Sequence, residues 1–340
     1  MTNPIVAGWY RANALSVLLR PLSWLYRGIV TARRGAYVRG WRKARRLPVP
    51  VIVVGNITVG GTGKTPLVVW LVDLLKREGF SPGVVSRGYK GQAEHWPQQV
   101  RPDSDPIMVG DEAIVLARRC RCPVAVGPAR VAAAEALLQY HPCDIVVSDD
   151  GLQHYALARD IEIVVIDGVR RFGNGHCLPA GPLREPVSRL RDADFLVVND
   201  GAAFQPEFSM STIATRLINV RRETETEMPD RFARRAVHAV AGIGHPDRFF
   251  RHLRQLGFEI EAHPFPDHHH FSSADLAFGD DRPIIMTEKD AVKCRRFCGE
   301  DCWYLAIEGR PEPRMESRLL SMIRDLRQDT AIALAGRAAE

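Results

Sequence analysis

The chain has 340 residues, of which 46% are hydrophobic and 25% are charged, and it carries a net charge of +6. This is the composition of an ordinary soluble globular protein, and the length exceeds that of a usual single domain, so two domains are expected. The seven cysteines are odd in number and irregularly spaced, which argues against a disulfide framework and favours a reducing compartment. Residues 1–72 contain eleven Lys and Arg residues and no Asp or Glu, so the positive charge belongs to one end of the chain.

Residues 1–46 combine apolar side chains with arginines and precede any catalytic motif. The longest uncharged stretch is shorter than the roughly 20 apolar residues that cross a bilayer, and no small-residue cleavage site marks a signal peptide. Aromatic residues such as Tyr37 and Trp41 stand among many cations, which is typical of a segment in the membrane interface. We expect an amphipathic helical segment on an anionic membrane surface, with no role in nucleic-acid binding. A helical hairpin that caps the core is the alternative.

The stretch Val51–Thr65, VIVVGNITVGGTGKT, predicts a phosphate-binding loop between a strand and a helix. Glycines let backbone N–H groups approach a phosphate, Lys64 supplies a charge for the β- and γ-phosphates, and Thr65 supplies a hydroxyl for Mg²⁺. The helix that follows adds the positive end of its dipole. Thr58 stands where the general motif has glycine, and an ordinary glycine-rich turn is the alternative. The expected ATP contacts are Thr58, Val59, Gly60, Gly61, Thr62, Gly63, Lys64 and Thr65.

Strand and helix patterns alternate from Pro48 onward. Apolar runs separated by helices indicate a parallel sheet covered on both faces, with ligands at the carboxyl ends of its strands. Strands are expected at 49–54, 82–85, 122–126, 144–150, 161–166 and 195–198, and helices at 66–76, 106–119 and 131–139.

Polar residues follow several of these strands. Arg87 can clamp phosphate oxygens, although a surface salt bridge is the alternative. The strand DIVVSDD delivers Asp149 and Asp150 in a Walker-B pattern, and either carboxylate can hold Mg²⁺. Two adjacent like charges need a cation near them, so the pair implies a metal, with a simple turn as the alternative. Gln153 and His154 add an amide and an imidazole at the same mouth.

Two more segments are candidates for the acceptor side of the site. Asp111 and Glu112 stand where a helix begins, and the sequence leaves open whether Asp111 is an N-cap or a base directed into the cleft. The loop LPAGPLREP, rich in proline and glycine, carries Arg184 and Glu185 and is suited to substrate contact.

A linker-like stretch and a charge-rich stretch precede a second run of strands and helices. We expect a segment 1–46, a P-loop domain 47–210, a linker 211–230 and a smaller α/β domain 231–330. The fold class is therefore α/β. Strands of the second domain are expected at 236–240, 259–262, 283–286 and 303–307, with a helix at 249–256.

In the second domain, Asp267 precedes three histidines, His268 to His270. A carboxylate beside an imidazole raises its basicity and sets its tautomer, so the segment predicts a proton-transfer pair. A zinc site and a solvated loop are the alternatives. Three cysteines, Cys294, Cys298 and Cys302, recur at helical spacing without the C-x₂-C pairs of zinc sites, which favours packing.

The ordered motifs GNITVGGTGKTP, SRGY, GDE, DDGLQH, LPAGPLRE and FPDHH resemble the tetraacyldisaccharide 4′-kinase family, the lipid A 4′-kinases of Gram-negative bacteria. The resemblance covers almost the whole chain, and the family shares the threonine at position 58. It implies transfer of the γ-phosphoryl group of ATP to the 4′-hydroxyl of a tetraacylated glucosamine disaccharide 1-phosphate, giving lipid IVA. The enzyme would be a peripheral or monotopic protein at the cytoplasmic face of the inner membrane.

The resemblance also implies roles for residues. Asp111 would be the base, assisted by His268 with Asp267 behind it, and the pair Asp149-Asp150 would serve the metal. Because these residues come from both domains, closure between the domains is implied. Active-site or substrate contacts are implied for Arg87, Glu112, Arg130, Gln153, His154, Arg184 and Glu185.

Two rival functions remain open from the residues alone. Thr287–Asp290, TEKD, is faintly similar to a guanine-reading motif, which would suit a P-loop GTPase or a metal-chaperone NTPase. A membrane-bound nucleotide sensor without catalysis is the other, but it leaves Asp111 and His268 without a role.

Overall fold

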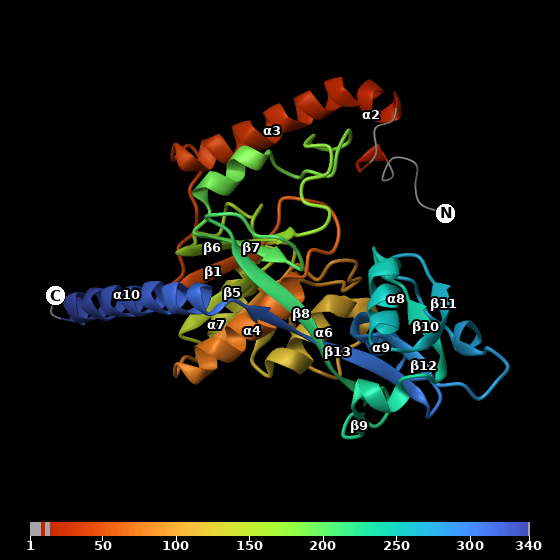
Figure 1. Cartoon of the computed structure of the whole chain (residues 1–340). Coiled ribbons are helices and arrows are strands. Elements are labelled where there is room, and N and C mark those ends of the chain that lie inside the picture. Colours follow the sequence, from red (N-terminus) through yellow and green to blue (C-terminus); the bar gives the residue numbers. More distant parts are fainter. Residues whose placement is uncertain (1–7, 11–13, 339–340) are drawn as a thin grey trace.

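The computed structural model describes residues 8–10 and 14–338, with side chains as far as residue 327. Its centre is one sheet of 13 strands in the order β11-β10-β12-β13-β8-β7-β6-β1-β5-β2-β4-β3, with β9 paired to β8 (Figure 1). The strands are β1 (Val51–Gly55), β2 (Pro82–Ser86), β3 (Gln98–Val100), β4 (Val124–Val126), β5 (Ile145–Asp149), β6 (Ile161–Asp167), β7 (Phe195–Asn199), β8 (Phe208–Asn219), β9 (Thr226–Glu227), β10 (Ala236–Ala241), β11 (Glu259–Pro264), β12 (Ile284–Thr287) and β13 (Cys302–Pro311).

The described residues also form helices, most of which pack against this sheet. They are α2 (Ala14–Leu18), α3 (Arg20–Val38), α4 (Lys64–Arg77), α5 (Pro106–Val109), α6 (Asp111–Cys120), α7 (Arg130–Tyr140), α8 (Pro246–Gln255), α9 (Glu288–Cys294) and α10 (Pro313–Ala338), with 3-10 helices η1 (Val187–Asp192), η2 (Pro229–Phe232) and η3 (Ser273–Leu276). The predicted α/β class is confirmed. Each predicted strand is present, and the central strands β1, β5 and β6 are buried on both faces.

The P-loop part of the sheet is parallel at its centre. Strand β1 pairs in parallel with β5 on one side and with β6 on the other. One face packs on α4, α6 and α10, and its core includes Leu67, Leu71, Ile114 and Leu319. The other face packs on α7 through a second cluster. The carboxyl ends of β1, β5 and β7 therefore meet at one edge, where Asn56, Asp149 and Asn199 stand.

Two long strands join the P-loop part to the C-terminal lobe, which consists of β10–β12, α8 and α9. Strand β8 continues the parallel sheet beside β7 and then runs antiparallel to β13, from the pair Met210–Pro311 to the pair Asn219–Trp303. The predicted linker 211–230 contains most of β8, which the sequence analysis missed because its residues are largely half-exposed. The predicted domain boundaries stay a prediction, since one sheet passes through both parts.

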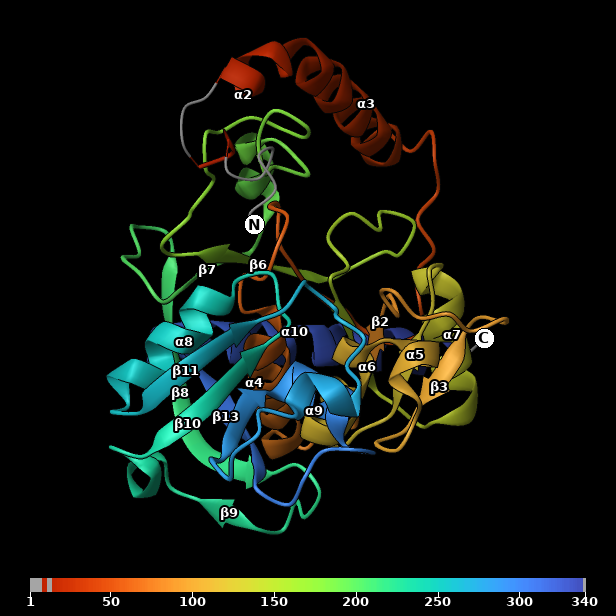
Figure 2. The same ribbon diagram turned by 90° about the vertical axis from the view of Figure 1, so that its right-hand side faces the viewer.

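The C-terminal lobe has a hydrophobic cluster on each face of its strands. The cluster toward α8 includes Phe250 and Leu253, and the other includes Cys294, Cys298 and Cys302. All three cysteines are buried and free, as the packing interpretation expects. Figure 2 shows this lobe beside the P-loop part, with α9 next to α6 and α8 on the far side of the lobe.

Helices α2 and α3 lie apart from the sheet, above the loop that precedes η1 (Figures 1 and 2). Three side chains anchor them to that loop: Ser16 Oγ donates to the carbonyl oxygen of Ala180 at 3.0 Å, Ser23 Oγ to Cys177 at 2.7 Å, and Tyr26 Oη to Arg184 at 3.2 Å. Helix α3 contains no acidic residue. Within residues 8–10 and 14–338, no helix is long and apolar enough to cross a membrane.

Candidate active site

The glycine-rich turn after β1 forms the floor of the site. Gly60 and Gly63 have φ values of 102° and 89°, which side chains rarely tolerate, and Gly63 caps α4 in the left-handed conformation. A Cβ at Gly63 would lie 2.1 Å from Nδ2 of Asn199, whereas one at Gly61 would meet nothing within 4 Å. Of the three glycines in this turn, Gly60 and Gly63 are therefore the two whose positive φ requires glycine.

Neighbouring segments hold the turn in shape. The N–H of Val59 donates to the carbonyl oxygen of Pro182 at 2.8 Å, and Thr58 forms an isolated bridge with Leu183. The side-chain amide of Asn199, at the end of β7, donates to the carbonyl oxygen of Thr62 at 3.1 Å. Helix α4 then begins at Lys64, so the helix dipole points into the turn as predicted.

The two carboxylates at the end of β5 have different surroundings. Asp150 lies 3.3 Å from Nζ of Lys64 and 3.0 Å from Nη1 of Arg184. Burial raises the pKa of Asp150, but Lys64 and Arg184 outweigh it and hold the pKa well below the usual range. Asp149 is buried, and burial together with Glu112 raises its pKa to about 6. One oxygen of Asp149 accepts from Ser86 Oγ at 3.0 Å, and Oδ1 has no hydrogen-bond partner among the described residues.

Residues behind β5 support this carboxylate pair. Arg130 is buried and donates to the carbonyl oxygens of Gly127 at 2.8 Å and Asp149 at 3.2 Å, so it holds the strand end in place. Gln153 donates to the carbonyl oxygen of Asn56 at 3.1 Å. Burial, with Arg130 and Arg87 nearby, lowers the pKa of His154 to about 4, which keeps this imidazole neutral at physiological pH.

Asp111 and His268 meet across the two parts of the chain. Nδ1 of His268 lies 3.0 Å from Oδ2 of Asp111, and Nε2 of the same ring lies 3.7 Å from Asp267. Asp111 is the first residue of α6 and Gly110 is its cap, so the N-cap alternative for Asp111 is wrong. Although burial opposes it, the bond to His268 lowers the pKa of Asp111, and that bond raises the pKa of His268. His269 instead faces Asp275 at 3.3 Å.

Two ion pairs beside this contact also join α6 to the C-terminal lobe. Lys289 pairs with Glu112, and Arg119 pairs with Glu288 at 3.2 Å. Lys289 lowers the pKa of Glu112, and burial opposes this effect. Two side chains of Thr287–Asp290, the segment that is faintly similar to a guanine-reading motif, therefore form ion pairs with α6. They are Glu288 and Lys289.

One cavity of about 740 Å³ connects these groups. Its wall includes the P-loop from Val59 to Thr65, the pair Asp149-Asp150, and His268 with Glu112 from the opposite side. Arg87 also lines it, exposed at the end of β2 and near the ring of Tyr89. Helix α3 contributes Tyr26, Val30 and Arg33. The predicted phosphate, metal and base residues thus surround or support one space.

Comparison with known proteins gives the family. A family model described as "Tetraacyldisaccharide-1-P 4'-kinase" matches residues 15–324. The "Tetraacyldisaccharide 4'-kinase" of Nitrosococcus oceani is 52% identical over 319 residues, 94% of each chain, and that of Alkalilimnicola ehrlichii is 54% identical over 310 residues, 91% of this chain and 92% of the relative. This chain belongs to the tetraacyldisaccharide-1-phosphate 4′-kinase family.

A solved member of the tetraacyldisaccharide-1-phosphate 4′-kinase family has the same fold. The crystal structure of LpxK from Aquifex aeolicus, described as a complex with ATP, is 30% identical to this chain with a TM-score of 0.79, covering 92% of this chain and 99% of that one. The predicted family and the predicted class of enzyme, a kinase, are confirmed. The GTPase or metal-chaperone alternative is not favoured, since residues 15–324 match this kinase family.

Several residues of this kinase site were not predicted. Asn199 and Ser86 stand at the ends of β7 and β2, so the rule that polar residues at strand ends face the ligand would have found them. The contact of Lys289 with Glu112 could not be predicted from a local pattern, because the two residues lie 177 positions apart in the chain. Arg170 binds Asp167 and donates to the carbonyl oxygen of Gly61 at 2.5 Å, beside the phosphate loop.

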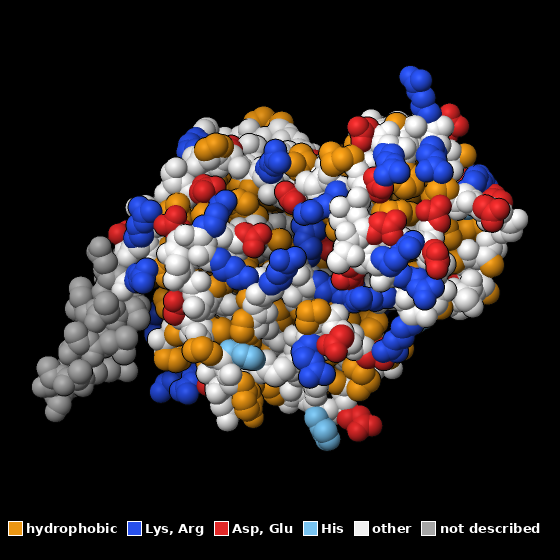
Figure 3. All heavy atoms as spheres, turned by 90° about the horizontal axis from the view of Figure 1, so that it is seen from below, with side chains coloured by type: hydrophobic (Ala, Val, Ile, Leu, Met, Phe, Trp, Pro, Cys, Tyr) orange, Lys and Arg blue, Asp and Glu red, His pale blue; other side chains and the backbone are white. Residues whose placement is uncertain are grey.

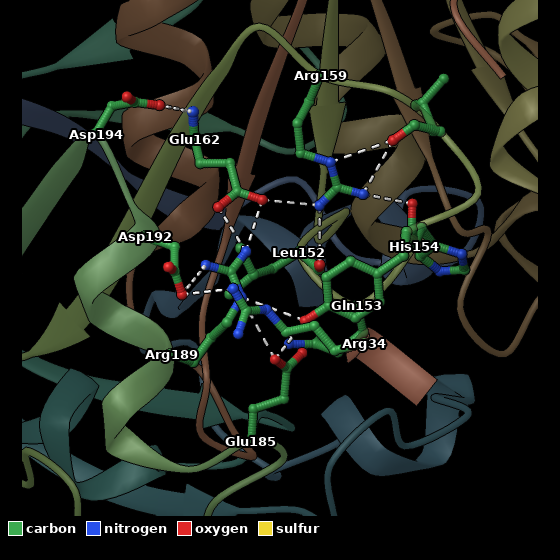
Figure 4. A network of polar contacts seen from close by, with 12 residues as sticks. Arg34, Leu152, Gln153, His154, Arg159, Glu162, Glu185, Arg189, Asp192 and Asp194 are labelled. Carbon is green, nitrogen blue, oxygen red and sulfur yellow. Dashed lines mark hydrogen bonds and ion pairs between the residues drawn. The ribbon is translucent and has the colours of Figure 1, made fainter. Parts of the chain in front are cut away.

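Glu185 occupies a different environment from the one expected of a substrate contact in this family. Its Oε2 accepts from Tyr155 Oη at 2.5 Å, and Arg189 lies 3.5 Å away. Glu162 pairs with the same arginine, and Arg34 of α3 reaches the cluster through Asp192 (Figure 4). This polar network fixes the loop that delivers Arg184 to Asp150.

Proposed function

We propose that the chain transfers the γ-phosphoryl group of ATP to the 4′-hydroxyl of tetraacyldisaccharide 1-phosphate, in the pathway to lipid A. This proposal rests on the shared cavity, which has the phosphate-binding loop on one wall and Glu112 with His268, the partner of Asp111, on the other. In-line phosphoryl transfer needs the donor and the acceptor to be held between such walls.

The chain's own residues supply positioning and proton transfer. Asp111 takes the proton of the acceptor hydroxyl as the new O–P bond forms and the bond to the β-phosphate oxygen breaks, which releases ADP. His268 bonds to Asp111 and stabilises its ionised form. Lys64 neutralises phosphate oxygens. Arg87, after the end of β2, and Arg184, in the loop before η1, line the same cavity and can assist.

The residues present fit a magnesium ion. Oδ1 of Asp149 is buried without a hydrogen-bond partner in the described part of the chain, and Thr65 lines the same cavity. We propose that Asp149 and Thr65 hold the ion and that Asp150, paired with Lys64 and Arg184, does not. When bound, Mg²⁺ supplies charge neutralisation at the β- and γ-phosphates.

We further propose that α2 and α3 place the enzyme on the cytoplasmic face of the inner membrane as a peripheral protein. Trp24, Leu25 and Ile29 are 63%, 60% and 58% exposed. Tyr26 and Val30, on another face of α3, line the cavity, so one helix borders both the outside and the site. By contrast, acidic and basic side chains are intermixed on the face seen from below (Figure 3). An acylated acceptor fits this arrangement, because its chains can stay in lipid while its sugar reaches the cavity.

The test is transfer of ³²P from labelled ATP to the disaccharide 1-phosphate in mixed micelles. We expect labelled product from the full chain, and a kcat lower by about 10²–10⁴ for Asp111→Ala with the Kd for ATP unchanged. ATP hydrolysis that does not depend on the disaccharide, or equal use of GTP, would contradict the proposal.

A further inference from the structure

Three side chains of metal-ligand type gather at the outer edge of the C-terminal lobe, away from the kinase cavity. Strand β11 is the edge strand of the sheet and pairs in parallel with β10. The register sets Glu261 opposite His238, and His263 follows two residues later on the same face of β11. The face is set by the core, because Ile260 packs in the cluster on the other side, against α8.

The ligand atoms of this cluster converge. Nδ1 of His238 lies 2.9 Å from Nε2 of His263, and each of these nitrogens lies 3.8 Å from an oxygen of Glu261. The three groups offer atoms that all lie within 4.8 Å of one another, which is the separation expected around one ion. We propose that His238, Glu261 and His263 form a binding site for a divalent transition metal, with Zn²⁺ as the ion that this ligand set fits best.

The second nitrogen of His238 supports this assignment. Nε2 lies 3.0 Å from Oδ1 of Asp280, so a proton on Nε2 donates to the carboxylate and leaves the lone pair of Nδ1 directed at His263 and Glu261. A carboxylate bound to the outer nitrogen of a ligating histidine sets its tautomer and raises its basicity in zinc sites. The ring of Phe278 stacks on both imidazoles, at 4.2 Å from His238 and 4.1 Å from His263. This stacking holds both imidazole rings in place.

The charge of the cluster favours a cation. Glu261 and Asp280 are each bound by Arg282 at 2.7 Å. Two negative carboxylates therefore share one positive guanidinium, so these three groups carry a net negative charge. Arg282 contacts Oε2 of Glu261, while Oε1 faces His263. The side chain of Glu261 is 53% exposed, so an ion has a path from solvent and water can complete the coordination.

A bound ion would clip the edge strand β11 to β10. The same strand leads within a few residues to Asp267 and His268, so the site stabilises the part of the lobe from which the catalytic loop emerges. The role is structural, because the cluster does not share residues with the kinase cavity.

Metal binding is the measurement that tests this site. The full chain, freed of metal with a chelator, is titrated with Co²⁺ and followed by its visible absorption, and then with Zn²⁺ as competitor and in thermal melts. We expect tetrahedral Co²⁺ bands that Zn²⁺ displaces, and a rise in Tm with Zn²⁺. Glu261→Gln and His263→Gln should remove the bands, and Asp280→Asn should weaken binding by about 10–100-fold.

Matched controls separate this site from others. His95→Gln removes an exposed histidine elsewhere and should leave the bands unchanged, as should His268→Gln in the kinase site. Circular dichroism shows whether each variant is folded, and transfer of ³²P should be retained by Glu261→Gln. Bands absent from the full chain, or retained in folded Glu261→Gln and His263→Gln, would mean that His238 and His263 are a hydrogen-bonded pair only.

Discussion

Nδ1 of His268 lies 3.0 Å from Oδ2 of Asp111, although 157 positions separate the two residues in the chain. One group stands at the start of α6 and the other on the loop after β11. Neither part of the chain contains the pair by itself. The arrangement of the C-terminal lobe on α6 therefore decides whether the proton-accepting pair exists.

Replacement of Asp111 by Asn should lower the pKa of His268. The bond to Asp111 is the largest effect that raises this pKa and burial opposes it, so the pKa of His268 should fall without the carboxylate. Because the folded pKa is raised, the stabilisation from this pair is complete below pH 6.5 and is lost as the pH rises through the raised value. NMR titration of the ring protons measures the shift. An unchanged pKa in Asp111→Asn would show that the contact does not control His268.

The two carboxylates after β5 should respond differently to removal of their charge. Asp149→Asn should raise the Mg²⁺ concentration needed for half-maximal rate by about tenfold or more, since it removes the negative charge of a buried carboxylate whose Oδ1 has no hydrogen-bond partner among the described residues. Asp150→Asn should change the Mg²⁺ requirement less and should instead release Lys64 and Arg184. Initial rates at saturating ATP against Mg²⁺ concentration distinguish the two. A larger metal effect for Asp150→Asn would reverse our assignment.

Gly63→Ala should impair ATP binding far more than Gly61→Ala. A Cβ at Gly63 would lie 2.1 Å from Asn199 at a φ of 89°, so it strains the backbone and displaces the amide that holds Thr62. A Cβ at Gly61 enters open space. We expect at least about tenfold weaker ATP binding for Gly63→Ala, equivalent to about 1.4 kcal/mol, by calorimetry. Equal effects at both glycines would count against this account of the loop.

Charged residues on the exposed side of α3 should release the enzyme from membranes. The double variant Leu25→Asp with Ile29→Asp should bind anionic vesicles at least about tenfold less in a sedimentation assay, because burial of each apolar side chain contributes about 1.5–3 kcal/mol. Val169→Asp is the control, since Val169 is 75% exposed on another part of the chain. Unchanged sedimentation of the double variant would exclude α3 as the membrane contact.

The buried ion pair beneath α3 should be important for stability. Glu162 lies 2.6 Å from Arg189, and both are buried (Figure 4). Glu162→Gln removes the carboxylate closest to the buried Arg189, while Glu185 stays 3.5 Å from the same guanidinium, so the free energy of unfolding should fall by about 1–3 kcal/mol. The exposed pair of Arg222 with Glu225 is the control, and Glu225→Gln should cost less than about 1 kcal/mol. Urea unfolding measures both, and equal costs would show that burial of Glu162 does not matter.

Local patterns were sufficient for much of the fold. The apolar runs before Asn56 and Asp149 had to be buried strands, and the glycines before Lys64 had to form a turn that admits a phosphate. Strand β8 was missed because its pairing with β13, rather than its own composition, makes it a strand. Pairing energy from a distant segment is not visible in a local pattern.

The phosphate-binding loop, the acidic strand end and the family could be predicted from the sequence, because each rests on residues close together in the chain or on their order. The folded arrangement was needed to establish that Asp150, and not Asp149, is bound by Lys64 and Arg184, and that His268 rather than His269 reaches Asp111. The same holds for the ligand cluster at His238, whose members come together through strand register. Electrostatic and hydrogen-bonded contacts act over a few ångströms of space, so they depend on the folded arrangement and leave no trace in sequence spacing.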